Sequence, residues 1–155
     1  MTTGIAVVRP GEGRSRWMLG ALIDLLVTGE DSGGAFALWE QSEPPGSGPP
    51  PHVHTREHET FYVLEGEYAF FGEQGRVEAG PGSLVFVPKG AVHTTRNVGK
   101  GPGKMLVLVA PAGFEGFFLE AGDPVADRAA APPPANEAKA RAAAPRYGMD
   151  VRELD

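Results

Sequence analysis

Short apolar stretches alternate with turn residues through most of this chain. Most of its 22 glycines and 15 prolines stand between these stretches rather than inside them. Short apolar runs bounded by Gly and Pro are typical of β-strands, and many of them at regular spacing indicate a sandwich or a small barrel. We therefore predict an all-β fold. The expected strands cover residues 5–8, 17–28, 35–42, 59–65, 68–71, 76–79, 84–87, 92–97 and 105–109.

The pattern changes after residue 113. Phe114, Phe117 and Phe118 recur at helical spacing, which predicts a short amphipathic helix. Three consecutive prolines at 132–134 then set apart an alanine-rich segment, residues 135–144, with high helix propensity. We assign residues 1–122 to one barrel domain and residues 123–155 to a Pro/Ala-rich, partly helical C-terminal arm. The arm either ends in a helix that packs on the barrel or on a second subunit, or it is a disordered tail.

Composition narrows the classes of partner. The chain has 155 residues, enough to bury a core, and 14 Lys and Arg against 20 Asp and Glu leave a net charge of −6. It has no basic block, which argues against nucleic acid and against an anionic membrane surface. The longest apolar patch, residues 18–27, is interrupted by Asp24 and is too short to span a bilayer, and the N-terminus lacks a signal-peptide core. We expect a cytoplasmic protein.

Histidines and one carboxylate suggest a metal site. The chain has no cysteine, so thiolate ligands are excluded and any metal must use nitrogen and oxygen donors. His52 and His54 are two residues apart and point to the same face of an extended segment, while Glu59 opens the next expected strand. His93 follows on a later strand. Three imidazoles and one carboxylate bind one divalent ion and leave open positions, which is typical of a catalytic site.

The donor set leaves the metal undecided. Nitrogen and oxygen donors suit Fe, Mn, Ni, Co or Zn alike. The remaining histidine, His58, alternates away from Glu59 in the strand, so we expect it to face outward. The simpler alternative is that each histidine is an ordinary packed or surface residue.

The histidines stand inside two motifs that resemble those of the cupin family. The first reads Gly46, five residues, His52-Val53-His54, four residues, Glu59, six residues, Gly66. The second reads Gly82, five residues, Pro88-Lys89-Gly90, two residues, His93, three residues, Asn97. Residues 67–81 separate the motifs, which is similar to the compact spacing of microbial monocupins. The resemblance implies a cupin (double-stranded β-helix or jelly-roll) barrel in which His52, His54, Glu59 and His93 are the metal ligands.

A finer resemblance suggests an activity. Residues 33–67 and the later segment 111–118 (PAGFEGFF) resemble small bacterial quercetin-dioxygenase-like cupins. This implies an enzyme that cleaves a flavonol or related enol with O2 and releases carbon monoxide, with Glu59 as the general base. Two alternatives stay open. One is a metal- and small-molecule-binding cupin without turnover, and the other is a metal-dependent isomerase, cyclase or lyase.

The resemblance and the strand pattern also suggest a pocket and an assembly. If Glu59 points inward, the period of two sends Phe61 and Val63 inward as well. Ordinary packing of the terminal helix is the alternative for its aromatic residues. Cupins commonly form homodimers, and the N-terminal strand and the arm are the natural contact elements. The candidate pocket residues are Phe36, Phe61, Val63, Phe86, Met105, Phe114 and Phe118.

Overall fold

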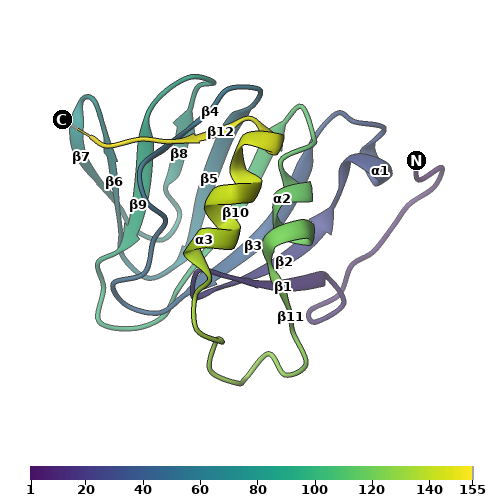
Figure 1. The fold of residues 1–155 in the computed structure, drawn as a ribbon. Helices are drawn as coiled ribbons and strands as arrows, with labels where there is room; N and C mark the ends of the chain where they lie inside the picture. Colours follow the sequence, from purple (N-terminus) through teal and green to yellow (C-terminus); the bar gives the residue numbers. More distant parts are fainter. Residues whose placement is uncertain (155) are drawn as a thin grey trace.

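The computed structural model describes residues 1–154 and consists mainly of two antiparallel β-sheets that face each other (Figure 1). The all-β barrel expected from the apolar pattern is confirmed. The larger sheet has seven strands in the order β11-β1-β2-β3-β10-β5-β8. Their bounds are β1 (Arg14–Met18), β2 (Ala21–Val27), β3 (Ala37–Glu43), β5 (His58–Glu65), β8 (Leu84–Val87), β10 (Gly103–Ala110) and β11 (Asp123–Pro124).

The smaller sheet has five strands in the order β12-β4-β9-β6-β7. The strand at one edge of this sheet, β12, comes from the C-terminal arm. The bounds are β4 (His52–His54), β6 (Tyr68–Gly72), β7 (Gly75–Ala79), β9 (His93–Asn97) and β12 (Met149–Val151). Chain segments far apart in sequence therefore lie side by side in both sheets.

Alternate residues of the strands point into the space between the sheets. Met105, Val107 and Val109 on β10 are fully buried, and the residues between them are only partly buried. Val107 stands opposite Trp39 on β3 and Phe61 on β5, so one row of large apolar side chains crosses the sheet. Burying such a row excludes water from the inner face of the sheet and supplies much of the stability of the fold.

The expected strand over residues 17–28 is in fact part of a hairpin. Met18 at the end of β1 pairs with Ala21 at the start of β2, which leaves a two-residue turn. The backbone φ angles of Leu19 and Gly20 are +49° and +86°, as a type I′ turn requires. Leucine is apolar and is rarely found in this conformation. The apolar pattern therefore continued across the turn, and the sequence offered too weak a sign that the chain reverses there.

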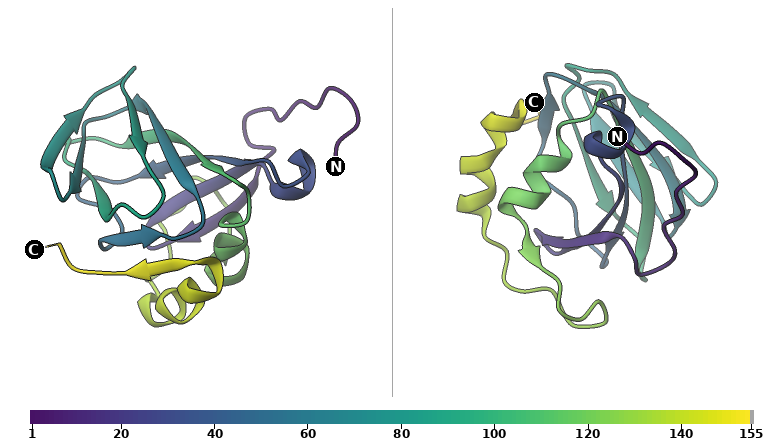
Figure 2. Two further views of the ribbon diagram at one scale, coloured as in Figure 1. Left: turned by 90° about the horizontal axis from the view of Figure 1, so that it is seen from above. Right: turned by 90° about the vertical axis from the view of Figure 1, so that its right-hand side faces the viewer.

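The strand expected over residues 5–8 is wrong. These residues lie in no strand of the described chain, and Ile5 is completely exposed. The segment projects from the body of the domain (Figure 2). A strand needs a neighbour for its backbone hydrogen bonds, and no sheet edge within residues 1–154 pairs with this segment.

The structure also contains short helices, most of them after β10. The helix expected after residue 113 is confirmed as α2 (Glu115–Ala121), and a single short turn, α1 (Gly29–Ser32), precedes β3. The alanine-rich segment forms α3 (Glu137–Ala143), continued by a 3-10 turn, η1 (Ala144–Tyr147). In the described part of the chain, no helix combines the length and the hydropathy needed to cross a membrane.

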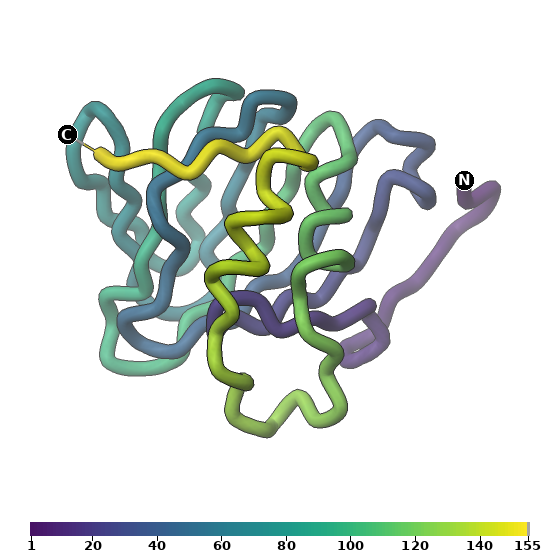
Figure 3. Tube along the Cα trace, in the orientation of Figure 1, coloured from purple at the N-terminus to yellow at the C-terminus, as the bar shows by residue number. Residues whose placement is uncertain are grey.

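The C-terminal arm packs on the barrel of its own chain. Ala140, Ala143 and Ala144 are buried, and the ring of Tyr147 meets the ring of Phe117 on α2. Beyond η1 the chain runs back along β4, where β12 forms a ladder (Figure 3). Of the two alternatives for the arm, the structure favours the one in which it packs on the barrel, through α3, η1 and β12, while its last residue, at position 155, lies outside the described residues.

Candidate metal centre

Three strands bring together the four residues expected to bind metal. His52 and His54 are the two ends of β4 and both point inward, Glu59 lies on β5, and His93 opens β9. His52 and His93 are direct partners in the ladder between β4 and β9. One potential donor atom from each of the four side chains lies within 4.8 Å of the others, and all four residues are buried.

The irregular segment before β4 is held against β9, and this places His52. The backbone N–H of Asn97 donates to the carbonyl of Ser47 at 3.0 Å, and the hydroxyl of Thr94 donates to the carbonyl of Pro49 at 2.5 Å. Between these contacts a Cβ on Gly48 would stand 1.9 Å from the carbonyl oxygen of Thr95. Only glycine permits this close approach of two backbones.

Hydrogen bonds on the outer ring nitrogens orient two of the imidazoles. Nδ1 of His52 lies 2.9 Å from the carbonyl of Pro50, and Nδ1 of His93 lies 3.1 Å from the carbonyl of Ala91. A carbonyl only accepts hydrogen bonds, so each Nδ1 carries the proton. In the neutral ring the lone pair is then on Nε2, the nitrogen left for a metal.

Glu59 is at the centre of the group. Its Oε2 atom lies 3.0 Å from Nε2 of His93 and 3.1 Å from Nε2 of His54. Burial by itself raises the pKa of Glu59, but the imidazoles of His54 and His93 outweigh it and hold that pKa well below its usual range. Glu59 is therefore ionised in the metal-free protein.

The histidines divide the charge unequally in the absence of metal. Burial lowers the pKa of His52 to about 3, and the neighbouring imidazoles of His93 and His54 lower it further. Burial also lowers the pKa of His54, but the carboxylates of Glu59 and Glu57 reverse the effect and raise it to about 9. The protonated imidazole of His54 thus offsets the charge of the buried Glu59 carboxylate, and a metal cation would take the place of this proton.

The donor set fits a divalent transition metal. Three imidazole nitrogens and one carboxylate oxygen converge in a buried space, and no cysteine is present to form a soft thiolate site. Two of the imidazoles already have the outer-shell hydrogen bonds that accompany metal-binding histidines. The geometry suits Fe, Mn, Ni, Co or Zn and selects none of them.

Glu57 completes the surroundings of the group and was missed by the sequence reasoning. It is buried, and its Oε1 lies 3.4 Å from Nδ1 of His54. Neither atom has a hydrogen-bond partner within residues 1–154. A carboxylate behind a histidine is a common device for orienting the ring towards a metal. The run HTREHE contained no signal for it, because Glu57 precedes the strand whose alternation was used.

His58 lies outside the group, as expected. Its side chain is exposed, and its Nδ1 accepts a hydrogen bond from the backbone N–H of Lys89 at 3.0 Å. The alternation along β5 therefore separates the outward-facing His58 from the inward-facing Glu59.

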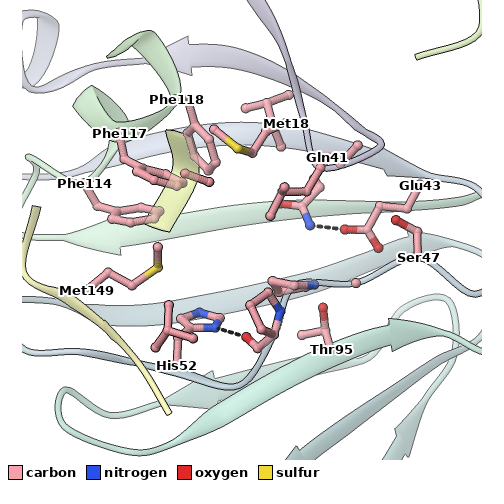
Figure 4. Close-up of a pocket in the computed structure, with 18 of the residues that line it drawn as sticks. Met18, Gln41, Glu43, Ser47, His52, Thr95, Phe114, Phe117, Phe118 and Met149 are labelled. Atoms are coloured by element: carbon pink, nitrogen blue, oxygen red, sulfur yellow. Dashed lines mark hydrogen bonds between the residues drawn. The ribbon is translucent and has the colours of Figure 1, made fainter. Parts of the chain in front are cut away.

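A cavity of about 300 Å³ lies beside the four residues, and His52, His54 and Glu59 form part of its wall. Its volume is at the lower end of the range for small-molecule sites. The rings of Phe114, Phe117 and Phe118 form an aromatic side of this cavity (Figure 4). The ring of Phe114 stands nearly perpendicular to that of His54, with centroids 4.4 Å apart. The aromatic helix α2 thus reaches the candidate metal centre itself.

The candidate pocket residues do not all lie at the cavity. Phe61, Phe114 and Phe118 line the cavity, whereas Val63 and Met105 are fully buried in the core away from it. The expectation is wrong for Phe86, which is 56% exposed. Phe86 on β8 stands opposite Thr60 on β5. The side chain of Thr60 points away from the space between the sheets, so both side chains lie on the outer face of the sheet.

Phe36 does not belong to the cavity wall described for residues 1–154. It is half-buried and precedes β3. On β3 the residues that point inward are Ala37 and Trp39, so Phe36 has the opposite phase.

Further cavity residues come from segments that the sequence reasoning did not connect with the site. Met149 of the C-terminal arm lies near the aromatic side, and Gln41, Glu43 and Thr95 lie at a polar side (Figure 4). Glu43 and Thr95 are buried polar residues on strands. Sequence alone offered no signal that they face the same space as the histidines.

Comparison with known proteins agrees with the fold. Residues 39–109 match the family described as a cupin domain. A quercetin 2,3-dioxygenase of Bacillus subtilis (strain 168) is 31% identical over 119 residues, which is 76% of this chain and 35% of that protein. The chain thus spans about a third of the length of this relative.

Solved structures give a wider range of activities on similar folds. A predicted oxalate decarboxylase from Thermotoga maritima has a TM-score of 0.63 at 26% identity, covering 68% of this chain and 99% of the other. The polyketide cyclase RemF from Streptomyces resistomycificus has a TM-score of 0.60 at 25% identity, covering 69% and 80%. The fold is therefore shared by proteins with different chemistry, and only the site can distinguish them.

Proposed function

Since this chain belongs to the cupin superfamily, we propose that it is a metal-dependent dioxygenase of the quercetinase type, which cleaves a flavonol or a related enol with O2. One observation carries the proposal. The buried carboxylate of Glu59 faces both the three imidazoles and an otherwise largely apolar cavity with an aromatic side. The 31% identity to a quercetin 2,3-dioxygenase supports the same substrate class.

Glu59 acts as the general base in this proposal. The enol O–H bond of the substrate breaks, the proton passes to the Glu59 carboxylate, and the electron pair remains on the substrate oxygen. Glu59 is suited to this role because its pKa is held well below the usual range of a carboxyl group, so that it is ionised, and because it lines the cavity.

His52, His54, Glu59 and His93 would hold the metal. When bound, a divalent transition metal supplies a positive charge for the enolate oxygen and a centre at which the enolate and O2 can react. The aromatic side chains of α2 then have a defined role. Phe114 covers the ring of His54, and Phe117 and Phe118 extend the apolar wall, so water is excluded from the reacting atoms.

Oxygen consumption tests the proposal. Protein loaded in turn with Fe, Mn, Co, Ni and Zn is assayed for O2 uptake and for loss of flavonol absorbance. We expect uptake with at least one redox-active metal, and a loss of about a hundred-fold or more in the rate for Glu59→Gln. Stoichiometric metal binding without O2 uptake on any flavonol would contradict the proposal.

A cyclase, isomerase or lyase acting on a polyketide-like enol is the second candidate. It is supported by the similarity to a polyketide cyclase and requires the same apolar cavity and general base. Such a reaction consumes no O2, so the uptake assay separates the two. A cupin that only binds metal and ligand would show neither O2 uptake nor any conversion of the ligand.

We also propose that two copies associate through the outer face of β5 and β8. Tyr62 and Leu84 stand opposite each other there with 41% and 63% of their surfaces exposed, and Phe86 extends the same apolar face. β8 is an edge strand in the sheet formed by residues 1–154, and an exposed apolar edge favours pairing with another chain.

Sedimentation equilibrium measures this association. We expect a dimer for the parent protein and a monomer when Leu84 and Phe86 are both replaced by lysine. Gln74→Lys, at an exposed turn, adds charge elsewhere and serves as the control. Equal masses for all three proteins would contradict this interface.

A further inference from the structure

The wall of the cavity changes in character along its length. At one side it is formed by the candidate metal ligands and by the aromatic rings of α2. At the other side Gln41, Glu43, Ser47 and Thr95 gather around a polar recess (Figure 4). A purely apolar ligand bound at the metal would leave this recess without a partner.

The strand registers place the recess at a distance from the metal centre. On β9 the buried residues His93, Thr95 and Asn97 follow one another at every second position. The side-chain amide of Asn97 donates to the backbone carbonyl of Glu43 at 3.1 Å, which sets Glu43 level with Asn97. Thr95 is thus about 7 Å of strand from His93, and Glu43 is level with a point about 13 Å along it.

A directed chain of hydrogen bonds leads to Glu43. The indole N–H of Trp39 donates to Oε1 of Gln41 at 3.2 Å, and an indole can only donate. The amide of Gln41 must therefore present its N–H2 group to Glu43, where it donates to Oε1. Trp39, Gln41 and Glu43 occupy successive inward positions of β3, so the chain follows the strand to its end. Glu43 receives one donor in this way and keeps its second oxygen as an acceptor.

Two polar atoms of the recess lack partners. Glu43 is 3% exposed and Thr95 is 2% exposed, yet Oε2 of Glu43 and the hydroxyl of Thr95 make no hydrogen bond to any residue described in the structure. Burying such groups unpaired is unfavourable for the fold. Both residues line the cavity, so a ligand that enters it can reach them.

The state of Glu43 is consistent with a binding role. Burial raises the pKa of Glu43 to about 7, although the hydrogen bond from Gln41 and the nearby hydroxyl of Tyr68 oppose this rise. The carboxyl group therefore changes between its neutral and ionised forms with little free energy near neutral pH. A ligand hydroxyl that donates to Oε2 would favour the ionised form.

From this geometry we propose that the Glu43–Thr95 recess binds a hydroxyl group at the end of the substrate remote from its metal-binding oxygens. The substrate class is then an elongated aromatic enol with at least one distal hydroxyl, rather than an unsubstituted one. The hydroxyl donates to Oε2 of Glu43, and Thr95 provides a second hydrogen bond. The inference rests on the proposed function in one respect only, namely that the other end of the ligand binds at the metal.

Binding of matched ligands tests the recess without turnover. Zinc-loaded protein is titrated under argon with 3-hydroxyflavone and with its analogues that carry one further hydroxyl at either end of the molecule. We expect at least one hydroxylated analogue to bind about ten-fold more tightly than the parent, as a hydrogen bond to a charged acceptor provides.

Three variants identify the groups responsible. Glu43→Gln keeps the shape, but the donation from Gln41 turns its amide N–H2 towards the cavity, so that a donor replaces the acceptor. We expect this variant to lose the preference for the hydroxylated ligand and to bind the parent flavonol as before. Thr95→Val should reduce the preference partly. Glu40→Gln, at an only partly buried position between the inward residues of β3, is the matched control and should change neither affinity.

The outcomes separate this inference from the proposed reaction. The proposed role of the recess would be wrong if the parent protein showed no preference for a hydroxylated ligand, or if no flavonol bound at all. It would also be wrong if the preference persisted in Glu43→Gln, or if a variant weakened the binding of all ligands equally. Selective binding without O2 uptake would leave the recess in place and overturn the dioxygenase. O2 uptake together with equal affinity for all the ligands would support the dioxygenase and contradict the proposed role of the recess.

Discussion

His52 and His93 are direct partners across the ladder between β4 and β9, with their ring centroids 4.5 Å apart. The two motifs that looked separate in the sequence therefore meet in one pair of hydrogen-bonded strands. Each imidazole is fixed by a backbone carbonyl within its own segment. The candidate metal centre depends on this pairing as much as on the identity of its residues.

Removing either partner should abolish tight metal binding. Outer-shell changes alone cost about 10- to 100-fold in metal affinity, so we expect His52→Ala and His93→Ala each to lose more than about a hundred-fold. Elemental analysis after gel filtration measures the metal retained per chain. His58→Ala, outside the group, should keep the parent stoichiometry. Full retention of metal by both ligand variants would refute the assignment.

Glu57 should act as a positioning residue for His54. Its carboxylate lies 3.4 Å from Nδ1 of His54, so Glu57→Gln removes the charge that favours this ring orientation. We expect metal affinity to fall by about ten-fold with stoichiometry preserved at high metal concentration. Competition with a chromophoric chelator measures it. Glu65→Gln, exposed at the end of β5, is the control, and equal affinities in both variants would contradict the role.

The stability of the fold should depend on pH through Glu43. Burial raises its pKa to about 7 from the ordinary value of 4.5, so the folded state binds the proton more tightly than the unfolded state. Protonated Glu43 therefore contributes its full stabilisation of the fold below the pKa that Glu43 has in the unfolded state. This contribution is lost as the pH rises through about 7. Of the neighbouring groups, the amide of Gln41, the hydroxyl of Tyr68 and the charge of Arg96 each lower this pKa and only partly offset the effect of burial.

Urea unfolding of the parent protein and of Glu43→Gln measures this dependence. The stability of the parent relative to the variant should fall by about 2 kcal/mol between about pH 5 and about pH 8, because the glutamine stays neutral. Glu40→Gln should follow the parent at both values. Parallel pH profiles for the parent and Glu43→Gln would show that Glu43 titrates normally.

Gly48 should be intolerant of a side chain. A Cβ at this position would stand 1.9 Å from the carbonyl oxygen of Thr95, so the segment must move away from β9 and carry His52 with it. We expect Gly48→Ala to lose about 2 kcal/mol of stability and to bind metal more weakly. Urea unfolding and metal titration measure these effects. Gly101→Ala, where a Cβ meets nothing within 4 Å, should be close to neutral.

The sequence predicted most strands because their burial follows a period of two and because Gly and Pro mark the turns. It failed where these signals were absent or misleading. Leu19 carries an apolar side chain through a tight turn, and the apolar residues 5–8 have no sheet neighbour within the described chain. Local pattern describes a segment, whereas a strand exists only with its partner.

The same division holds for the site. The spacing of His52, His54 and Glu59, together with the second motif around His93, was sufficient to select the four residues that the structure brings together. The alternation along β5 also separated His58 from them. These predictions succeeded because each depends on neighbours a few residues apart.

Only the tertiary structure decided what surrounds that group. Glu43 on β3, Thr95 on β9 and the arm residue Met149 share one cavity, although nothing in their local sequence relates them. Alternation within a strand tells which residues point inward, but the sheet order and the packing of α2 and α3 determine what they meet there. The sequence by itself therefore determined the barrel and the candidate metal-binding group, and long-range packing alone decided the shape and polarity of the space in which a substrate would bind.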